Sequence, residues 1–508
     1  MTTAAGPAVP PYLRTDFLDA RQGTASAWSE RQRRLPKRGC KSNDRSVNFT
    51  HRIFRSILTA FFVCLLPFAN AADAAKPNIV FILADDSGLG EFGCYGGTAI
   101  PTPNVDRLAA EGMRFTGAYS GSAVCAPTRC VIMTGQHPGH GLRRANQSKV
   151  GLLSLATGTV TTARLLHDAG YATGGFGKWG LGNEGTTGAA EKQGFDLFYG
   201  YYDQVHAHSY YPDDLTRNGL REKLPGNKDG KGTQYSHDLI EAETLQFIES
   251  GAKGGKPFFC YAAWTLPHGK YEIPSYAAFA NQPWPEPVKI HAAMIARLDT
   301  GVGRIMAKLK ELGIDRNTLV IFSSDNGAEG PGKVTFNATA GLRGFKRDLH
   351  EGGIRAPFIA RWPGKVAAKA TSDLLAGQLD LMATFAELAG VPPPRNDGVS
   401  MVPTLLGRPQ TTKHESLYWE IYEGPAPFQQ AVRFGKWKGY RTGTKAPLEL
   451  YDLETDPAEA KDVAGQHAAE VKAIEAIMAR EHVPSPNYDA PEEPGARKGG
   501  GKKKAAAK

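Results

Sequence analysis

Short apolar runs that end abruptly in polar residues recur along the middle of the chain. Residues 78–84 (NIVFILA), 171–176, 257–264 and 318–324 are rich in β-branched and aromatic side chains. Runs of this length and composition are typical of strands that are buried on both faces, as in a parallel sheet. The pattern therefore predicts four buried strands.

Helical patterns alternate with these runs, and each of them is followed by a glycine that can end a helix. The predicted helices cover residues 104–111, 161–169, 237–250, 288–312 and 380–389, and the glycines are Gly112, Gly170, Gly251, Gly313 and Gly390. Strands that alternate with helices predict an α/β layered domain. In such folds ligands bind at the carboxyl ends of the strands.

The pattern changes after Gly398, where short strand-like segments replace the long helices. Strands are predicted at 417–421, 430–441 and 448–453, and an amphipathic helix at 468–481. We therefore expect a large domain over residues 72–398 and a smaller C-terminal α+β domain over residues 399–483. A basic tail of low complexity, which we expect to be disordered, follows over residues 484–508.

The positive charge of the chain is concentrated at its two ends. The net charge is +9 over 508 residues, yet residues 1–71 hold 11 Lys/Arg against 4 Asp/Glu, and residues 494–508 hold 6 Lys/Arg and no acidic residue. Residues 72–493 therefore carry a net charge of −4. A mildly acidic body does not favour a nucleic-acid partner, and we expect none.

Residues 1–71 form a predicted leader that ends in a secretory signal peptide at about 52–71. Arg52 and Arg55 precede an apolar run over 57–68, and Ala69-Asn70-Ala71 offers a cleavage pattern. The run is too short to span a bilayer, so we expect no stable membrane span and an exported protein, periplasmic or extracellular. A membrane anchor is the alternative. Because residues 1–51 come first, we expect a start downstream of Met1 or a long leader.

Four predicted strands deliver polar side chains to their carboxyl ends. Asp85-Asp86 and Asp325-Asn326 follow two of them, and Lys178 and His268 follow the other two. Three carboxylates and an amide are hard oxygen ligands, which suit Ca²⁺ or Mg²⁺ better than Zn²⁺. Turn chemistry is the alternative, because Asp-Asp-Ser-Gly and Asn-Gly sequences favour loops. The position of both motifs at strand ends favours a metal site.

Basic residues near these carboxylates predict an anion site. Lys178, Lys346, Arg129 and His268 supply positive charge, and a helix that starts near Pro127 would add its N-terminal amides. A solvated surface position is the alternative for each lysine.

The cysteines after the leader need an explanation other than disulfides, and two further histidines lie near one of them. Cys94, Cys125, Cys130 and Cys260 follow the leader and are too few for a disulfide scaffold. We expect Cys130 and Cys260 to be buried thiols. His137 and His140 are predicted to be structural or to line a pocket.

The segment Cys125-Ala126-Pro127-Thr128-Arg129 resembles the Cys-x-Pro-x-Arg signature of the type I, formylglycine-dependent sulfatases of the alkaline phosphatase superfamily. The resemblance extends from about Pro77 to about Val463. Its further motifs are Asp85-Asp86, Gly177-Lys178-Trp179, Pro267-His268, Asp325-Asn326-Gly327, Lys346 with Glu351–Arg355, and Leu450–Pro457. It implies an alkaline-phosphatase-like fold, in which helices sandwich a large mixed β-sheet in the catalytic domain 72–398. The smaller domain is implied to carry a short antiparallel sheet.

The resemblance also implies a function and a role for each motif. Cys125 is oxidised to formylglycine by a maturation enzyme, and the hydrated aldehyde attacks sulfur and later releases sulfate by elimination. One Ca²⁺, with Mg²⁺ as the alternative, is held by Asp85, Asp86, Asp325, Asn326 and the modified Cys125. Arg129 supports the diol, while Lys178, Lys346 and His268 bind the sulfate and protonate the leaving oxygen. We expect a sulfated glycan as substrate rather than a small aryl sulfate.

One motif departs from the family pattern. Gly180 stands where the familiar Gly-Lys-Trp-His-Leu-Gly motif has a histidine, and His206 or His208 is our candidate replacement. Two alternatives follow: a phosphodiester or phosphonate monoester hydrolase of the same superfamily, and an inactive protein that binds sulfated glycans. Aromatic residues in 199–211 and 419–422 could line a sugar pocket or belong to the core.

Overall fold

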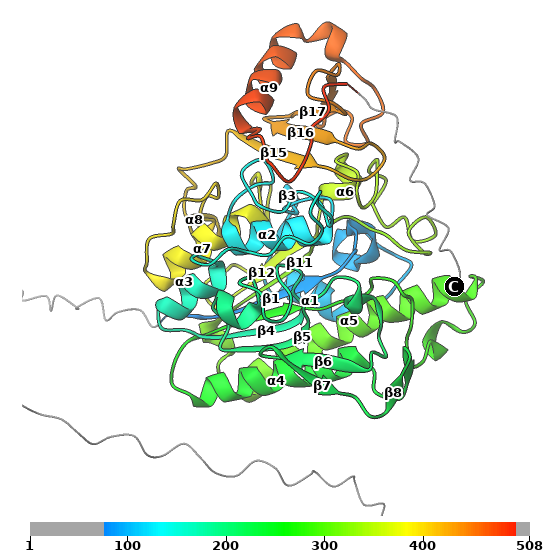
Figure 1. Ribbon diagram of the computed structural model, residues 1–508, viewed down its shortest axis with the longest axis vertical. Helices are drawn as coiled ribbons and strands as arrows, with labels where there is room; N and C mark the ends of the chain where they lie inside the picture. Colours follow the sequence, from blue (N-terminus) through cyan, green and yellow to red (C-terminus); the bar gives the residue numbers. More distant parts are fainter. Residues whose placement is uncertain (1–75, 494–508) are drawn as a thin grey trace, which may run out of the picture. The chain divides into compact units, whose positions relative to one another are not determined.

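The computed structural model describes residues 76–493, so the predicted signal peptide and residues 494–508 lie outside the described residues. A mixed sheet of ten strands lies at its centre (Figure 1). Across the sheet the strands are β13 (Ala370–Ser372), β2 (Met113–Phe115), β12 (Phe358–Arg361), β11 (Thr318–Ser324), β1 (Asn78–Ala84), β10 (Phe258–Ala263), β4 (Ala172–Lys178), β5 (Leu197–Tyr201), β6 (Asp214–Arg217) and β7 (Leu220–Lys223).

The five strands at the middle of this sheet, β11, β1, β10, β4 and β5, are parallel. Ile82 of β1 is in register with Ala262 on one side and Phe322 on the other. The four buried strands predicted from the sequence are confirmed, and β1 and β11 have the predicted bounds. Their carboxyl ends therefore meet along one edge of the sheet.

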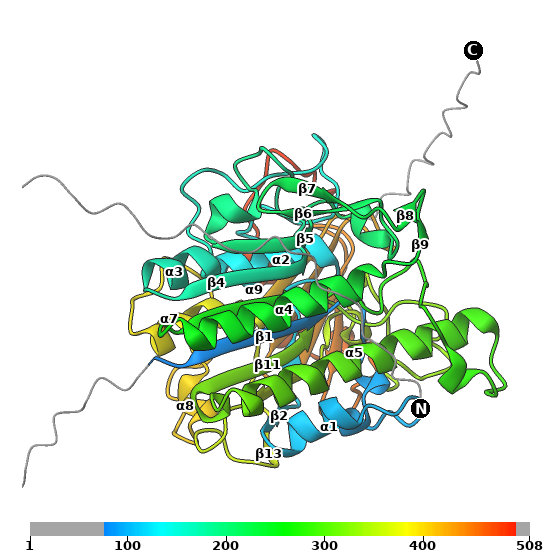
Figure 2. The ribbon, with the colours of Figure 1, turned by 90° about the horizontal axis from the view of Figure 1, so that it is seen from below.

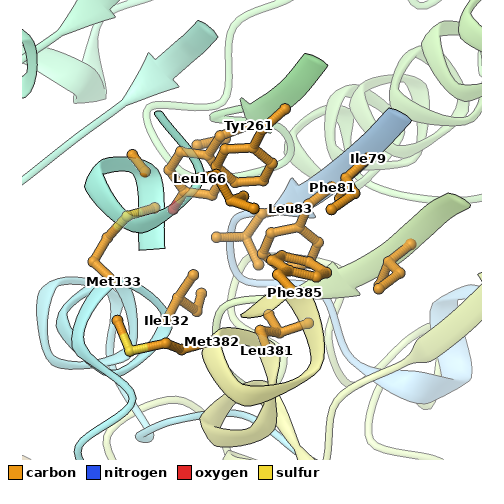
Figure 3. Close-up of a cluster of buried hydrophobic side chains, with 14 of the residues drawn as sticks. Ile79, Phe81, Leu83, Ile132, Met133, Leu166, Tyr261, Leu381, Met382 and Phe385 are labelled. Atoms are coloured by element: carbon orange, nitrogen blue, oxygen red, sulfur yellow. The ribbon is translucent and has the colours of Figure 1, made fainter. Parts of the chain in front are cut away.

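Helices cover both faces of the sheet (Figures 1 and 2). The first face carries α2 (Cys125–Thr134), α3 (Thr162–Asp168) and α7 (Leu381–Ala389), and the second carries α1 (Pro103–Ala110), α4 (Ser236–Lys253) and α5 (Glu286–Glu311). Side chains alternate along β1, so Phe81 belongs to the first core and Ile82 to the second. Figure 3 shows part of the first core, where Phe81 lies beside Phe385. Each such side chain contributes about 1.5–3 kcal/mol by its burial.

The predicted end of α4 at Gly251 is wrong, because the helix continues to Lys253. Gly251 lies against the ring of Phe258, where a Cβ atom would come within 2.7 Å of a ring carbon. The glycine is therefore needed for close packing of the helix on β10. The backbone turns left-handed only at Gly255, with φ +68°.

The single strand predicted at 430–441 is also wrong, because the segment forms a hairpin. β16 (Gln429–Phe434) and β17 (Trp437–Arg441) are antiparallel and are joined through Gly435, which has φ +55°. Apolar residues on both sides of the turn concealed it in the sequence pattern. A left-handed residue at the turn is what tight hairpins require.

The C-terminal part is a four-stranded antiparallel sheet, β15 (Ser416–Ile421), β16, β17 and β18 (Glu449–Asp452), covered by α9 (Ala468–Glu481). Ile474 and Met478 of α9 pack with Val432 and Leu450. Residues 484–493, which we placed in the tail, continue along this part, and the Tyr488 hydroxyl accepts the Arg144 N–H at 3.2 Å.

The remaining short elements complete the chain. They are β3 (Ala118–Tyr119) with β14 (Ala376–Gly377), β8 (Asn227–Lys228) with β9 (Lys231–Gly232), α6 (Glu351–Ile354) and α8 (Val402–Leu405). Tyr201, Tyr210 and Trp419 are buried in the apolar clusters, so these aromatic residues belong to the core rather than to a sugar pocket. Over residues 76–493, no helix combines the length and the apolar character needed to cross a membrane.

Candidate active site

The carboxyl edge of the parallel strands gathers the predicted site residues. Asp85 and Asp86 follow β1, and Asp325 and Asn326 follow the neighbouring strand β11. Lys178 ends β4, and His268 lies in the loop after β10. Cys125 is the first residue of α2, and Arg129 lies one turn further along the same helix. The first four residues are at most 2 % exposed, although all of them are polar.

Two cations neutralise the Asp85 carboxylate. Lys178 Nζ lies 2.7 Å from Asp85 Oδ2, and Arg129 Nη2 lies 3.3 Å from the same oxygen. Arg129 also contacts Asp325 Oδ2 at 2.9 Å and donates to the Lys178 carbonyl at 2.6 Å. Arg129 therefore joins the strands β1, β11 and β4 at the site.

Asp86 has a partner set of its own. Lys346 Nζ lies 2.6 Å from Asp86 Oδ1, and the Asn326 side-chain amide donates to the same oxygen at 2.9 Å. The backbone of Asp86 has φ +74°, in the left-handed region, and its N–H donates to Asp325 Oδ1 at 3.1 Å. Backbone strain of this kind is concentrated at functional sites in proteins.

Burial and charge shift the pKa values of the three carboxylates in different directions. Burial raises the pKa of Asp85, but Lys178, His268 and Arg129 lower it by more, so it lies well below its usual range. Burial and the neighbouring Asp85 raise the pKa of Asp325 to about 7. Three carboxylates crowded into a buried site are typical of a centre that binds a cation.

The donor set fits a hard divalent cation. Asn326 Oδ1 is buried and has no hydrogen-bond partner within residues 76–493. Ligand atoms of Asp85, Asp86, Cys125 and His268 lie within 4.8 Å of one another. Asp325 completes the oxygen-rich side of the cluster, since its Oδ1 accepts the Asp86 N–H. Asp85, Asp86, Asp325 and Asn326 are therefore the residues that could hold the metal.

Cys125 faces this cluster. Its Sγ lies 3.5 Å from Asp85 Oδ1, and the residue is 1 % exposed. Burial and the nearby Asp85 raise the pKa of the thiol to about 12. Thr128 and Ala126, which follow it, have their backbone N–H groups occupied by Val124 O and Asn146 Oδ1. Cys130 and Cys260 are buried free thiols, as predicted.

His268 and His208 stack beside the carboxylates. Their ring centroids lie 4.5 Å apart, and His268 Nε2 lies 3.5 Å from Asp86 Oδ2. His268 Nδ1 lies against the Gly269 carbonyl, which only accepts, so Nδ1 carries a proton. Burial and the nearby Lys178 lower the pKa of His268 to about 3, which leaves Nε2 free of a proton in the absence of a ligand.

Of the two candidate replacements for the missing histidine, only His208 lies at the site. His206 instead lies against the ring of Tyr201, and its Nε2 is 4.0 Å from Asp214 Oδ1. The sequence could not distinguish them, because both belong to the same short 3-10 turn.

The backbone at Gly180 explains why no histidine stands there. Gly180 has φ +78°, and a Cβ atom would lie 1.8 Å from the Gln204 Nε2 atom. The side chain of Gln204 therefore occupies the space that a histidine would need. Sequence reasoning missed this contact, as it missed Asn146, because a lone polar residue in a loop carries no local signal.

His137 and His140 follow the end of α2 that lies away from Cys125, and both predicted roles fit them, because they make structural contacts and His137 also lines two cavities. Their rings are 4.1 Å apart, and they pair with Asp397 and with Glu481 of α9. They connect the end of α2 to the C-terminal helix.

The fold and the site together define a class of protein: an alkaline-phosphatase-like hydrolase with a buried carboxylate centre and a surrounding set of cations. The comparison with known proteins then gives the family. The sulfatase family model matches residues 77–391, and the model of the N-sulphoglucosamine sulphohydrolase C-terminal region matches residues 343–482. The chain belongs to the sulfatase family, and it is a sulfuric ester hydrolase.

Individual relatives agree with this assignment. Human arylsulfatase A is 33 % identical over 450 residues, which cover 78 % of this chain and 85 % of the relative. An N-acetylgalactosamine-6-O-sulfatase from Bacteroides thetaiotaomicron is 29 % identical, and the match covers 80 % of this chain and 94 % of the relative. The crystal structure of Ps i-CgsB has a TM-score of 0.72 at 29 % identity, covering 80 % of this chain and 94 % of that one.

Proposed function

We propose that this protein releases inorganic sulfate from a sulfated carbohydrate, after Cys125 has been converted to formylglycine and with one Ca²⁺ bound. The observation that carries the proposal is the position of Cys125, at the start of α2 and against Asp85, within a cluster of three carboxylates and three cations. The proposal includes export of the protein and a separate maturation enzyme that acts on Cys125.

The unmodified thiol is poorly suited to be the nucleophile. With a pKa raised to about 12, its thiolate form is a very small fraction at neutral pH, and the thiolate is the reactive form of cysteine. Formylglycine supplies a hydrated aldehyde, whose hydroxyl group serves as nucleophile and whose second hydroxyl allows sulfate to leave. Conversion of Cys125 accounts for a buried, protonated cysteine at the centre of the site.

The oxygen ligands suit Ca²⁺, and Mg²⁺ remains the alternative. A bound divalent cation lowers the pKa of the nucleophile and neutralises charge on a sulfate oxygen. Asp85, Asp86 and the converted Cys125 would hold it together with Asp325 and Asn326, which contact Asp86. Lys178 and Lys346 keep their ammonium groups charged, because the neighbouring aspartates raise the pKa values of both lysines despite their burial.

The basic residues orient the substrate in this proposal. Lys178 and Lys346 bind the sulfate oxygens, while Arg129 holds Asp85 and Asp325 in place. His268 protonates the leaving oxygen, for which it must first take up a proton at Nε2 when the anionic substrate enters. His208, stacked on His268, takes the role of the histidine that is absent at Gly180. A general acid or base in such a position contributes about 10²–10⁴-fold.

The carbohydrate part of the proposal is supported by relatives that act on sugars or bind them. One relative is named as an N-acetylgalactosamine-6-O-sulfatase, and Ps i-CgsB has been solved in complex with k-i-k-neocarrahexaose. A phosphonate monoester hydrolase from Agrobacterium radiobacter has a TM-score of 0.59 at 20 % identity, which shows a common fold only.

The first test is a mass spectrum of the tryptic peptide 115–129 from protein co-expressed with a formylglycine-generating enzyme. The proposal expects formylglycine or its hydrate at Cys125. It also expects the protein to release sulfate from sulfated sugars faster than it hydrolyses an aryl phosphate diester under the same conditions. A thiol that stays unmodified beside a competent maturation enzyme contradicts the proposal. Binding of sulfated glycan without any sulfate release would instead identify an inactive binding protein.

A further inference from the structure

A small cavity with both polar and apolar lining residues lies next to the catalytic edge and takes no part in the mechanism above. Its volume is about 50 Å³, and its lining includes Arg143, Ser154, Gly180, Asn183 and Gln204. A water molecule needs about 10–15 Å³ of such space, so the cavity has room for three or four heavy atoms and not for a sugar ring. We call it the Arg143 cavity.

Arg143 is a buried cation without an anionic partner. It is 2 % exposed, and within residues 76–493 no carboxylate lies within 4.0 Å of its guanidinium. It donates to the Leu153 carbonyl at 2.6 Å and to the Asn146 carbonyl at 3.4 Å, while its Nε has no partner. The adjacent Arg144 is equally buried, but its charge is compensated by the Glu420 carboxylate at 2.5 Å. An unpaired buried guanidinium is costly unless something compensates its charge.

Gln204 also lines this cavity and carries a second donor without a partner. It is 7 % exposed, and its Nε2 is buried without a hydrogen-bond partner among the described residues. Glycine at position 180 leaves room for this amide, because a Cβ atom there would lie 1.8 Å from its Nε2. Buried polar groups are rarely left unpaired in native proteins, so two unpaired donors on residues that line one cavity point to a ligand that only accepts.

We propose that the Arg143 cavity is a subsite for an anionic group of the substrate other than the sulfate that is cleaved. A carboxylate, as on a uronic acid, has the size of the cavity and accepts from both Arg143 and Gln204. A second sulfate ester has the same chemistry and is the alternative source. This inference rests on the proposed function, and it narrows the substrate to glycans that carry a further negative charge.

The cavity is connected to the catalytic centre by short links. Gly180 lies two residues after Lys178, which contacts Asp85. Arg143 donates to the Asn146 carbonyl, and the Asn146 side chain accepts the N–H of Ala126, the residue after Cys125. A group bound in the cavity would therefore fix the substrate relative to the nucleophile. If Arg143 had only a structural role and held the loop 146–153, substrate binding would not depend on the charge of the substrate. The dependence of binding on substrate charge therefore distinguishes the two roles.

The test uses three disaccharides with one sulfated hexosamine. The second sugar carries a free carboxylate in the first, a primary alcohol made by carboxyl reduction in the second, and a sulfate ester at that position in the third. The variants are Gln204→Leu, which removes the donor and keeps the shape, Arg143→Gln, and Leu152→Ala as a control on the apolar wall of the cavity. Sulfate release gives KM and kcat, and calorimetry gives binding to protein whose Cys125 has not been converted.

The wild-type protein should bind the carboxylated disaccharide at least 10-fold more tightly than the reduced one. Gln204→Leu should cut that preference to about twofold by raising KM, with kcat and the hydrolysis of 4-nitrophenyl sulfate unchanged, and Leu152→Ala should keep it. A preference for the third disaccharide over the first would assign the cavity to a second sulfate.

Equal binding of all three disaccharides by the wild-type protein overturns the inference. The inference is also overturned if Gln204→Leu retains the full preference for the carboxylated disaccharide over the reduced one. This result can be obtained even if Arg143→Gln does not fold. If no probe releases sulfate, including 4-nitrophenyl sulfate with converted protein, the proposed function fails instead. The binding measurements still decide the inference in that case.

Discussion

His208 and His206 are separated by one residue, yet they face different surroundings. The ring of His208 stacks on His268 at the carboxylate cluster, whereas His206 packs on Tyr201 near Asp214. At the scale of single residues, chemistry depends on which way each side chain points. The two histidines therefore form a natural matched pair for mutagenesis.

We predict that His208→Ala lowers kcat by about 10²–10⁴-fold, the usual contribution of a general acid or base. His206→Ala, the control, should leave kcat within about threefold. The measurement is steady-state sulfate release by formylglycine-containing protein, with the content of formylglycine determined for each variant. Similar losses for both variants, or none for His208→Ala, would remove His208 from the proposed mechanism.

At the scale of secondary-structure elements, a buried ionic cluster joins α6 to the C-terminal sheet. Glu351 of α6 accepts from Lys438 of β17 at 2.9 Å, from the Tyr119 hydroxyl at 2.8 Å and from Arg355 at 3.0 Å. Glu459 Oε2 in turn accepts the Glu351 N–H at 2.6 Å. Burial raises the pKa of Glu351, but Lys438 and Arg355 lower it by more, to about 2.

We predict that Glu351→Gln lowers the free energy of unfolding at pH 7 by about 3 kcal/mol, since breaking a buried ion pair leaves its cations uncompensated. A carboxylate with a lowered native pKa stabilises the fold above its unfolded pKa, near 4.5, and this stabilisation is lost as the pH falls through about 2. The difference between variant and wild type should therefore shrink between pH 4.5 and pH 2. Urea unfolding at pH 7, 4 and 3 measures it.

The exposed Glu454 provides the control for that experiment. Glu454→Gln should change the free energy of unfolding by less than about 0.5 kcal/mol at every pH, because surface substitutions away from special features have small effects. A deficit of Glu351→Gln that stays constant from pH 7 to pH 3 would show that the variant acts by packing rather than by charge.

Prediction from sequence succeeded where one local signal determined the element. The apolar runs of β1 and β11 predicted both strands with their bounds, and the polar residues after them predicted the carboxylate cluster, because parallel strands share one edge. It failed where tertiary packing determined where an element ends or turns. Gly251 continues a helix because Phe258 lies against it, and Gly435 turns a hairpin inside an apolar segment.

The residues around the cavity could not be predicted for the same reason. Arg143 stands beside Arg144 in the sequence, and no local signal shows that Arg144 has a carboxylate partner while Arg143 has none among residues 76–493. Gln204 acquires its importance from Gly180, a residue on another loop. The four residues of the carboxylate cluster were predicted because each follows a strand, whereas these depend on contacts between loops.

At the scale of the whole molecule, the charges of the site are balanced without the metal. Asp85, Asp86 and Asp325 each contact a cation of the chain, namely Lys178, Lys346 or Arg129. A fold that balances these charges itself would not need the proposed Ca²⁺ in order to stay folded. Loss of the metal should therefore affect catalysis more than structure.

We predict that removal of divalent cations by a chelator abolishes sulfate release and leaves the far-ultraviolet circular dichroism unchanged. Ca²⁺ added at about 100 times its Kd should restore activity and stabilise the protein by about 2.7 kcal/mol, which scanning calorimetry detects as a higher Tm. Asp86→Asn should lose this Ca²⁺-dependent rise in Tm. If Ca²⁺ changes neither Tm nor activity, the oxygen cluster is not its site.

The burial of Cys125 also sets an order of events in time. Only 1 % of the residue is exposed, and the partners around it come from distant parts of the chain, with Asp325 and Lys346 some two hundred residues later. An enzyme that oxidises the Sγ atom has no route to it once those residues are in place. If Cys125 is converted as proposed, the conversion has to be finished on a nascent or still unfolded polypeptide, and a chain that folds first would keep the thiol.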